Sequence, residues 1–337
     1  LGKILKLQAE QNGATEFLIT DNRRFTYAEA ENITNRLATG FMALGVGKHD
    51  RVSLMMASTP EMVLLCLALN KIGAVWVPVC TDYKGEWLLD TLKRSKAKAL
   101  VTDAEYIERI KAIEDKLSVE RRVVIEKDVA AANNAISYEQ LCEHEPHTAD
   151  YDGMSFGDTC AILWTSGTTG RSKGVMQPHN NWIRAVDLGA GLMFTARPGD
   201  VVYCALPLYN SGAWVTCVIR AMIAGIGVVI EKTFSVSRFV ERIKQFNATQ
   251  TFAEGSMGVF LMGLPEQPDD ADNPLREAGI VPMPPQLWDA FEKRFGVHLV
   301  RSGLGMSECL LVMNQEHADV EAPTYALGFP PPDADVR

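Results

Sequence analysis

The segment of this chain whose residue types most clearly suggest chemistry is a run of hydroxyl residues and glycines that ends in a lysine. Residues 165–174 read TSGTTGRSKG and follow the apolar run ILW. Glycines let backbone N–H groups surround an anion, the hydroxyls of Ser166, Thr168 and Thr169 add donors, and Lys173 adds a positive charge. A polar turn between a strand and a helix would explain the glycines and hydroxyls, but not the closing Lys-Gly pair. The segment therefore predicts a phosphate-binding loop.

This loop is not the common P-loop of nucleotide triphosphatases. That loop has four residues between its two glycines and then Gly-Lys-Ser/Thr. Here two residues separate Gly167 from Gly170, and a glycine follows Lys173. The pattern TSGTTGxxKG instead resembles the signature of the adenylate-forming enzymes, the superfamily of acyl-CoA synthetases, peptide-synthetase adenylation domains and luciferases.

Four further segments resemble core motifs of the same superfamily and occur in its order. They are FTYAEA at residues 25–30, LNKIGAVWVP at 69–78, LPLYNSG at 206–212 and LGMSE at 304–308. The resemblance thus covers nearly the whole chain. Within the superfamily, YKGE at 83–86 and the short path from 275–277 to Phe291 look most like the crotonobetaine/carnitine and fatty-acid-transport branches.

The resemblance implies a nucleotide site and its catalytic groups. In adenylation a carboxylate attacks the α-phosphate of ATP and expels pyrophosphate, and the main task is to place and neutralise repelling anions. Glu308 is the expected Mg²⁺ ligand and Ser307 a donor to the α-phosphate, although both could instead cap a helix. The residues expected at the nucleotide are Thr165, Ser166, Gly167, Thr168, Thr169, Gly170, Lys173, Leu304, Gly305, Met306 and Ser307. The expected catalytic residues are Lys173, Glu308 and Asn210.

Two positions depart from the superfamily pattern. Asn210 stands where many relatives have a histidine that gates the acid pocket or contacts the substrate carboxylate, so a donor is kept but titration near neutral pH is lost. Leu304 replaces the tyrosine that lies against adenine, so the surface stays apolar without aromatic stacking. These changes affect specificity for the carboxylic acid substrate and for the nucleotide base, not the reaction class.

The resemblance places the acid-binding pocket between Trp214, the segment at residues 252–256 with Glu254 and Ser256, and Gly303. An anionic Glu254 beside Trp214 could hold a cationic group of the acid, as in the carnitine-type relatives. The alternative, which we prefer at this stage, is that Glu254 only precedes a helix and is favoured there by the helix dipole.

Composition fits a globular enzyme core. The chain has 337 residues, is 47% hydrophobic, and carries 33 basic and 42 acidic residues for a formal charge of -9. This charge argues against nucleic acid as a partner and against binding to an anionic membrane surface. No apolar run is long enough to span a membrane and no secretory leader is visible, so we expect a cytoplasmic protein without an integral membrane segment. A homodimer is compatible with this composition.

Strand and helix patterns alternate along the chain, which predicts an α/β fold. Short apolar runs suited to strands covered on both faces occur at 52–56, 75–79, 99–102 and 123–126, then at 201–205, 227–231, 249–252 and 297–301. Helices are predicted from a capping box at 26–29, from Thr59 to Gly73, and at 213–224, 236–246 and 286–295. We expect two packed lobes of largely parallel sheets with flanking helices, at residues 45–195 and at 1–44 plus 196–325. Residues 265–274 read as a surface loop.

The ends of the chain bear on the predicted function. The sequence begins at Leu1 without a methionine and closes at Arg337, where the resembling enzymes continue into a small C-terminal domain. We therefore expect residues 1–337 to be the large N-terminal domain. The predicted activity is that of an AMP-forming acyl-CoA ligase of the EC 6.2.1 type, which uses ATP, Mg²⁺, coenzyme A and a carboxylic acid of the fatty-acid or carnitine kind. Alternatives are an adenylation domain that loads a carrier protein, a luciferase-like oxidase and a non-catalytic nucleotide sensor.

Overall fold

The chain folds into two compact units. The computed structural model describes residues 1–147, 153–165, 171–314 and 325–335. The first unit comprises Leu1–Ala14 and Tyr27–Asn180, and the second comprises Thr15–Thr26 and Asn181–Arg337. This division differs from the predicted lobes. Residues 15–26 form a hairpin that joins the sheet of the second unit, whereas the helices before and after it pack in the first.

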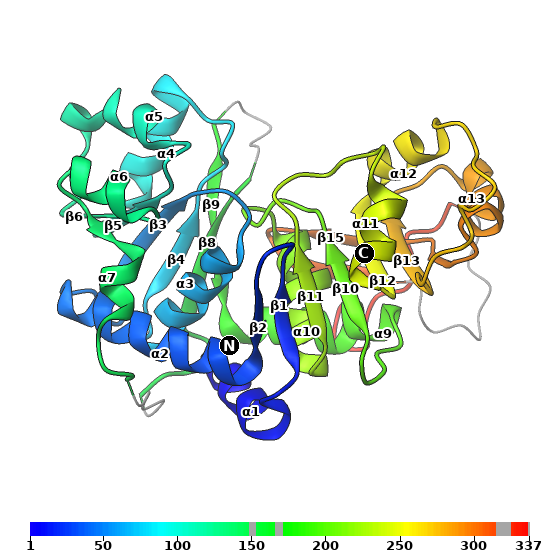
Figure 1. Ribbon diagram of the computed structural model, residues 1–337, viewed down its shortest axis with the longest axis horizontal. Coiled ribbons are helices and arrows are strands. Elements are labelled where there is room, and N and C mark those ends of the chain that lie inside the picture. The colour runs from blue at the N-terminus through cyan, green and yellow to red at the C-terminus, as the bar shows by residue number, and fades with distance from the viewer. Residues whose placement is uncertain (148–152, 166–170, 315–324, 336–337) are drawn as a thin grey trace. The chain divides into compact units, whose positions relative to one another are not determined.

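A seven-stranded sheet forms the centre of the first unit (Figure 1). Its strand order is β7-β6-β5-β3-β4-β8-β9, and every neighbouring pair is parallel except β8 with β9. The four predicted apolar runs are the central strands β3, β4, β5 and β6. The strands are β3 (Arg51–Met55), β4 (Val75–Pro78), β5 (Ala99–Thr102), β6 (Arg121–Val124), β7 (Ile136–Ser137), β8 (Thr159–Thr165) and β9 (Lys173–Pro178).

Helices cover this sheet and bury its apolar side chains. The leucines of α4 pack with α5 residues against β3 and β5 in one core cluster. Helix α3 begins after Thr59 with a proline at its first position, as predicted, and all twelve of its residues are buried. The helical segments are α1 (Gly2–Asn12), α2 (Tyr27–Ala43), α3 (Pro60–Lys71), α4 (Gly85–Ser95), α5 (Ile107–Lys111), η1 (Glu114–Lys116), α6 (Lys127–Ala132) and α7 (Tyr138–Cys142).

A second seven-stranded sheet forms the centre of the second unit. Its order is β14-β13-β12-β10-β11-β1-β2, and β1 with β2 is its one antiparallel pair. The strands are β1 (Glu16–Ile19), β2 (Arg24–Thr26), β10 (Val201–Cys204), β11 (Gly227–Ile230), β12 (Gln250–Glu254), β13 (Glu277–Val281) and β14 (His298–Val300). Aromatic residues of α11 (Phe239–Phe246) and α13 (Trp288–Phe295), with Leu261 of α12 (Gly255–Met262), pack against this sheet in one large cluster.

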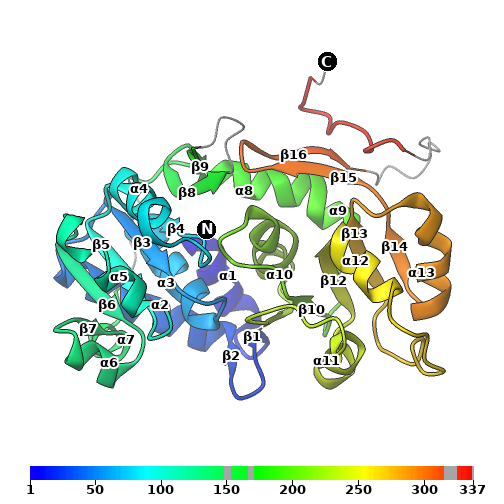
Figure 2. The same ribbon diagram turned by 90° about the horizontal axis from the view of Figure 1, so that it is seen from above.

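Other segments of the second unit carry the residues of greatest interest. After α8 (His179–Ala185), the chain forms a π-helical segment η2 (Val186–Ala190) and then α9 (Gly191–Met193). The predicted helix at 213–224 is present, but its first half is a π-helix, η3 (Ala213–Val218), which continues into α10 (Ile219–Ala224). A two-stranded hairpin of β15 (Gly303–Met306) and β16 (Cys309–Asn314) lies beside η2 (Figure 2). The 3-10 turn η4 (Pro285–Leu287) precedes α13.

The mixed α/β architecture with two largely parallel sheets confirms the predicted fold class. Residues 265–274 contain no helix or strand, as expected for a loop, although Asp270 within them is buried against Arg294 at 2.7 Å. Across the part of the chain that the structure describes, no helix is both long enough and apolar enough to cross a membrane.

Candidate active site

The predicted phosphate loop joins two antiparallel strands of the first unit. Thr165 ends β8 and lies directly opposite Lys173, which begins β9. Lys173 is exposed, so its ammonium group is accessible to a ligand. The loop therefore connects a strand to a strand, not a strand to a helix. Five of the predicted phosphate ligands lie outside the described residues: Ser166, Gly167, Thr168, Thr169 and Gly170.

The strand that carries Lys173 is held to helix α4 through its neighbour. Ser172 is buried, and its hydroxyl lies 3.0 Å from the phenol oxygen of Tyr83. Arg94 donates to the Ser172 carbonyl at 2.6 Å, and Arg171 donates to Asp90 of α4 at 2.6 Å. These bonds fix the residues immediately before Lys173. Sequence reasoning identified the YKGE segment, which contains Tyr83, only by resemblance, and it missed Arg94. Neither Tyr83 nor Arg94 belongs to the glycine-rich pattern.

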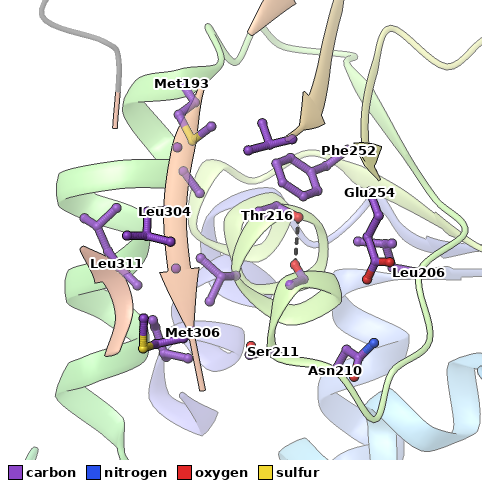
Figure 3. A pocket seen from close by; sticks show the side chains of 18 of the residues that line it. Met193, Leu206, Asn210, Ser211, Thr216, Phe252, Glu254, Leu304, Met306 and Leu311 are labelled. Atoms are coloured by element: carbon purple, nitrogen blue, oxygen red, sulfur yellow. Dashed lines mark hydrogen bonds between the residues drawn. The ribbon is translucent and has the colours of Figure 1, made fainter. Parts of the chain in front are cut away.

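A cavity of about 410 Å³ lies within the second unit, and we call it the second-unit cavity. Its wall is mostly apolar, with side chains from β12, η3, β15 and β16. Figure 3 shows Leu304, Met306 and Leu311 on one side and Leu206 with Glu254 on the other. Cavities of this size with few polar groups are typical small-molecule sites.

Seven predicted site residues, drawn from three separate segments of the chain, line this cavity. They are Asn210, Glu254, Gly303, Leu304, Gly305, Met306 and Ser307. They come from the turn after β10, from the end of β12 and from the hairpin β15–β16. Because the carboxyl ends of parallel strands meet at one edge of a sheet, segments distant in sequence converge there.

Two predicted pocket residues do not line the second-unit cavity. Trp214 is 1% exposed, and its indole N–H donates to the Leu208 carbonyl at 2.7 Å, so it packs in the core of η3. Ser256, in the first turn of α12, is also absent from the lining. The π-helical geometry places the neighbours of Trp214, Val215 and Thr216, at the cavity instead.

Glu254 ends β12 and precedes α12. Glu254 thus stands immediately before the helix, as the preferred expectation for this residue has it, and its side chain makes no capping hydrogen bond to the helix. Within the described residues its carboxylate has no hydrogen-bond or ion-pair partner, and it extends at the cavity wall (Figure 3). The helix starts close to other backbone here: a Cβ on Gly255 would lie 1.5 Å from the Pro282 carbonyl oxygen, so this position requires glycine. The tight approach fixes where Glu254 leaves the strand.

Ser307 and Glu308 form the two-residue turn of the hairpin β15–β16. No helix begins there, so the helix-capping alternative for this pair is wrong. Glu308 is exposed at the tip of the hairpin, whereas Ser307 is half-buried and lines the cavity. Arg184 donates to the Leu311 carbonyl at 3.3 Å and Asn314 to the Leu188 carbonyl at 2.8 Å, which anchors the hairpin to α8 and η2.

The donor set at Glu308 suits a magnesium ion that phosphates also bind. Among the described residues, no three His, Cys, Asp or Glu side chains gather into a metal-binding group. Mg²⁺ in nucleotide-dependent enzymes is commonly held by one or two carboxylates together with substrate phosphates and water. A single exposed carboxylate on the hairpin turn fits that pattern.

Sequence reasoning did not single out Met193 or Thr216, which also line the cavity, and it included Phe252 only as part of the segment at residues 252–256. Phe252 packs with Met193, Phe194 and Val300 in a small cluster at the cavity. These residues carry no motif, because their role depends on which face of a strand or helix meets the cavity. The period-two alternation along β12 is a signal that could have placed Phe252 and Glu254 on the same face.

The chain is similar to proteins of one family over almost its entire length. A family model described as AMP-binding enzyme matches residues 5–337. A medium/long-chain-fatty-acid–CoA ligase, FadD6, of Mycobacterium tuberculosis is 29% identical over 310 residues, which are 91% of this chain and 51% of the relative. A crotonobetaine/carnitine–CoA ligase of Citrobacter koseri is 32% identical over 293 residues, which are 86% of this chain and 56% of the relative.

Solved structures share the fold of this chain. The anthranilate CoA ligase AuaEII in complex with anthranoyl-AMP superposes with a TM-score of 0.88 at 20% identity, covering 98% of this chain and 64% of that one. The N-terminal domain of FACL13 from Mycobacterium tuberculosis gives a TM-score of 0.78 at 25% identity, covering 91% and 76%. The chain spans about half the length of the curated relatives it matches. From the family match over residues 5–337 and these likenesses, we conclude that this chain belongs to the AMP-binding enzyme family.

Proposed function

We propose that this chain is the large domain of an acyl-CoA ligase, which uses ATP to convert a carboxylic acid to an acyl-adenylate and then transfers the acyl group to coenzyme A. The observation that carries the proposal is the second-unit cavity, where predicted site residues from three separate segments meet on an apolar wall. Such a wall suits the organic part of an acid, and membership of the AMP-binding family supplies the nucleotide chemistry.

The roles of the polar residues follow from the charges that adenylation must balance. Lys173 would contact the β- and γ-phosphates together with the loop at residues 165–170, because a charge-assisted contact offsets the repulsion between ATP and the acid. Glu308 would hold a magnesium ion, which would neutralise phosphate charge when bound. Ser307 would donate to the α-phosphate, and Asn210 would direct its amide toward the substrate carboxylate.

The wall of the cavity also suggests what kind of acid is bound. Most of the lining is apolar, which favours an aliphatic or aromatic acid. Glu254 is the exception, because its carboxylate is not neutralised by any described residue. A second candidate substrate is therefore an acid that carries a cationic group, for which Glu254 would be the counter-charge.

An ATP–pyrophosphate exchange assay tests the proposal. The chain, extended to the length of its relatives, is assayed with saturated fatty acids of several lengths, with aromatic acids, and with acids that bear a trimethylammonium group. We expect exchange above background with at least one class. Exchange with none of them, from folded protein that binds AMP, would contradict ligase activity and favour a nucleotide sensor.

The variant Glu254→Gln distinguishes the two substrate classes. The change keeps the size and polarity of the side chain and removes its charge. If the acid is cationic, kcat/KM for it should fall about 10-fold or more, because a charge-assisted contact is worth roughly 1.5–3 kcal/mol. If the acid is purely apolar, the variant should be as active as wild type or more active.

The acyl acceptor is tested by adding thiols to the preformed adenylate. Coenzyme A and a phosphopantetheinylated carrier protein are supplied separately, and thioester is measured for the 337-residue chain and for the extended chain. We expect the extended chain to form acyl-CoA and the 337-residue chain to bind AMP weakly but form little thioester. Transfer to the carrier protein alone would favour the adenylation-domain alternative.

A further inference from the structure

A different cavity, of about 360 Å³, lies within the first unit, and we call it the first-unit cavity. It opens along one face of the hairpin β8–β9 and is closed by the starts of β3 and β4 and the end of α4. None of the roles proposed above uses the residues that line it. It is also formed entirely by residues of the first unit, separate from the lining of the second-unit cavity.

One side of the first-unit cavity is a flat apolar surface. Ile162 lies directly opposite Met176 in the hairpin and Trp164 directly opposite Gly174, so all four face the same way. A Cβ on Gly174 would sit 3.0 Å from Cγ2 of Ile162 and 3.5 Å from the Cη2 and Cζ3 atoms of Trp164, so the glycine leaves this part of the indole ring uncovered. The Met176 side chain is 65% exposed. The hairpin therefore presents an indole ring and a flexible thioether that a flat apolar group can contact.

The polar part of the lining is basic. His49, Arg51 and Arg94 line the cavity, and no aspartate or glutamate does. This contrasts with the formal charge of -9 on the whole chain. The Arg94 guanidinium lies 5.0 Å from the centroid of the Trp164 ring, so cationic and aromatic groups adjoin.

The two arginines differ in how much of their charge is already balanced. Arg94 pairs with Asp90 at 3.3 Å and donates to the Ser172 carbonyl. Arg51 donates to the Ser95 carbonyl at 3.1 Å and makes no ion pair with any residue that the structure describes. A guanidinium has five N–H donors, so Arg51 retains donors and charge for an anion.

We propose that the first-unit cavity binds a small molecule in which a phosphate or a carboxylate is attached to a flat apolar ring. Arg51 binds the anionic group, the face of Trp164 and the thioether of Met176 contact the ring, and Arg94 adds positive charge beside the Trp164 ring. The volume is in the range of known small-molecule sites. The proposal does not depend on the ligase activity, because no residue of the proposed catalytic machinery takes part.

Methyl NMR of the methionines tests this proposal directly. The protein is labelled with ¹³C at the methionine methyl groups, and the Met176 signal is assigned from the variant Met176→Leu. The probes are 2-naphthyl phosphate and 2-naphthoate. Two comparison compounds each supply only one part of such a ligand: 2-naphthol has the ring without the anion, and inorganic phosphate is an anion without the ring. Met193, Met306 and Met313 line the second-unit cavity, so their signals report binding there in the same titration.

We expect a saturable shift of Met176 with at least one of the two aromatic anions, and much weaker shifts with 2-naphthol and with phosphate. Arg51→Gln should weaken the affinity read from Met176 about 10-fold, because it removes a charge-assisted hydrogen bond. Trp164→Leu should weaken it as well, whereas Trp164→Phe should retain most of it. Arg51 is preferred over Arg94 for this test because Arg94 also holds the strand that carries Lys173.

Arg122→Gln is the matched control, since Arg122 belongs to the same sheet and pairs with Glu114 away from the cavity. It should bind both probes as wild type does. Circular dichroism and thermal melts confirm that each variant is folded. The proposal is overturned if Met176 does not shift while Met193 and Met306 do, or if folded Arg51→Gln binds as tightly as wild type at Met176.

Discussion

Gly279 offers a sharp test of how the second-unit cavity is shaped. It lies in the middle of β13, directly opposite Phe252 of β12, which lines the cavity. A Cβ on Gly279 would lie 2.7 Å from Cδ2 of Phe252 and 2.9 Å from Cζ of Phe194. Ordinary contacts begin near 3.4 Å, so in Gly279→Ala the Phe252 ring has to retreat by about 0.7 Å.

The two rings are not equally free to move. Phe194 is 2% exposed, and the guanidinium of Arg220 lies 4.3 Å from its centroid. Phe252 is half-buried and has the cavity beside it. We therefore expect Phe252 to move into the cavity and reduce its volume.

The expected energies follow from these contacts. Overpacking costs about 1–3 kcal/mol, and replacing a strand glycine by alanine returns roughly 0.5–1 kcal/mol, so Gly279→Ala should be destabilised by about 0–2.5 kcal/mol. The loss of space should disfavour large acids. One methylene in an apolar pocket changes kcat/KM by roughly 10- to 200-fold, so the largest accepted acids should lose at least 10-fold relative to the smallest.

Pyrophosphate exchange over a series of acids of increasing size measures the change in selectivity, and urea unfolding measures the change in stability. The double variant Gly279→Ala/Phe252→Leu is the control, because a smaller neighbour relieves the overlap and should restore larger acids. An unchanged size profile in a destabilised Gly279→Ala would mean that Phe252 does not bound the acid site.

Three further predictions concern single charges. Lys173→Ala should lower adenylation by roughly 10- to 1000-fold without loss of folding, because the side chain is exposed and its expected partner is a transferring phosphate; exchange equal to wild type would exclude that contact. Glu308→Gln should weaken the apparent affinity for Mg²⁺ in the same assay, and an unchanged Mg²⁺ titration would exclude the metal role. Burial lowers the pKa of Lys71 from 10.5 to about 8, although Glu31, whose carboxylate lies 2.5 Å from the Lys71 ammonium, acts to raise it. The Lys71 side chain therefore binds its proton more tightly in the unfolded chain than in the folded one. The resulting cost of about 3 kcal/mol is present in full below pH 8 and disappears as the pH rises to 10.5, so the stability of wild type relative to Lys71→Met should rise across this window in urea unfolding.

Much of the fold and the family could be predicted from the sequence, because both depend on local patterns. Continuous apolar runs such as residues 99–102 suit strands that are covered on both faces, and they form the centres of the parallel sheets. The signals of Thr59 and Pro60 mark the start of α3 within one residue of where it begins. The spacing of glycines before Lys173 predicts a loop for phosphate, since backbone N–H groups near an anion require particular residues in a particular order, and this role stays a prediction.

The lining of the second-unit cavity depends on contacts between segments that are distant in the chain. Local sequence patterns do not predict such contacts. The resemblance places Trp214 at the acid pocket, yet Trp214 lies in the core of the π-helix η3, and Thr216 lines the cavity instead. For Ser307 and Glu308 the sequence left a helix cap open as an alternative, and the pairing of β15 with β16 shows that they close a hairpin. The sequence by itself determined which chemical groups are available. Only the tertiary structure determined which of them share one cavity, because that depends on which face of each strand and helix is buried against its neighbours.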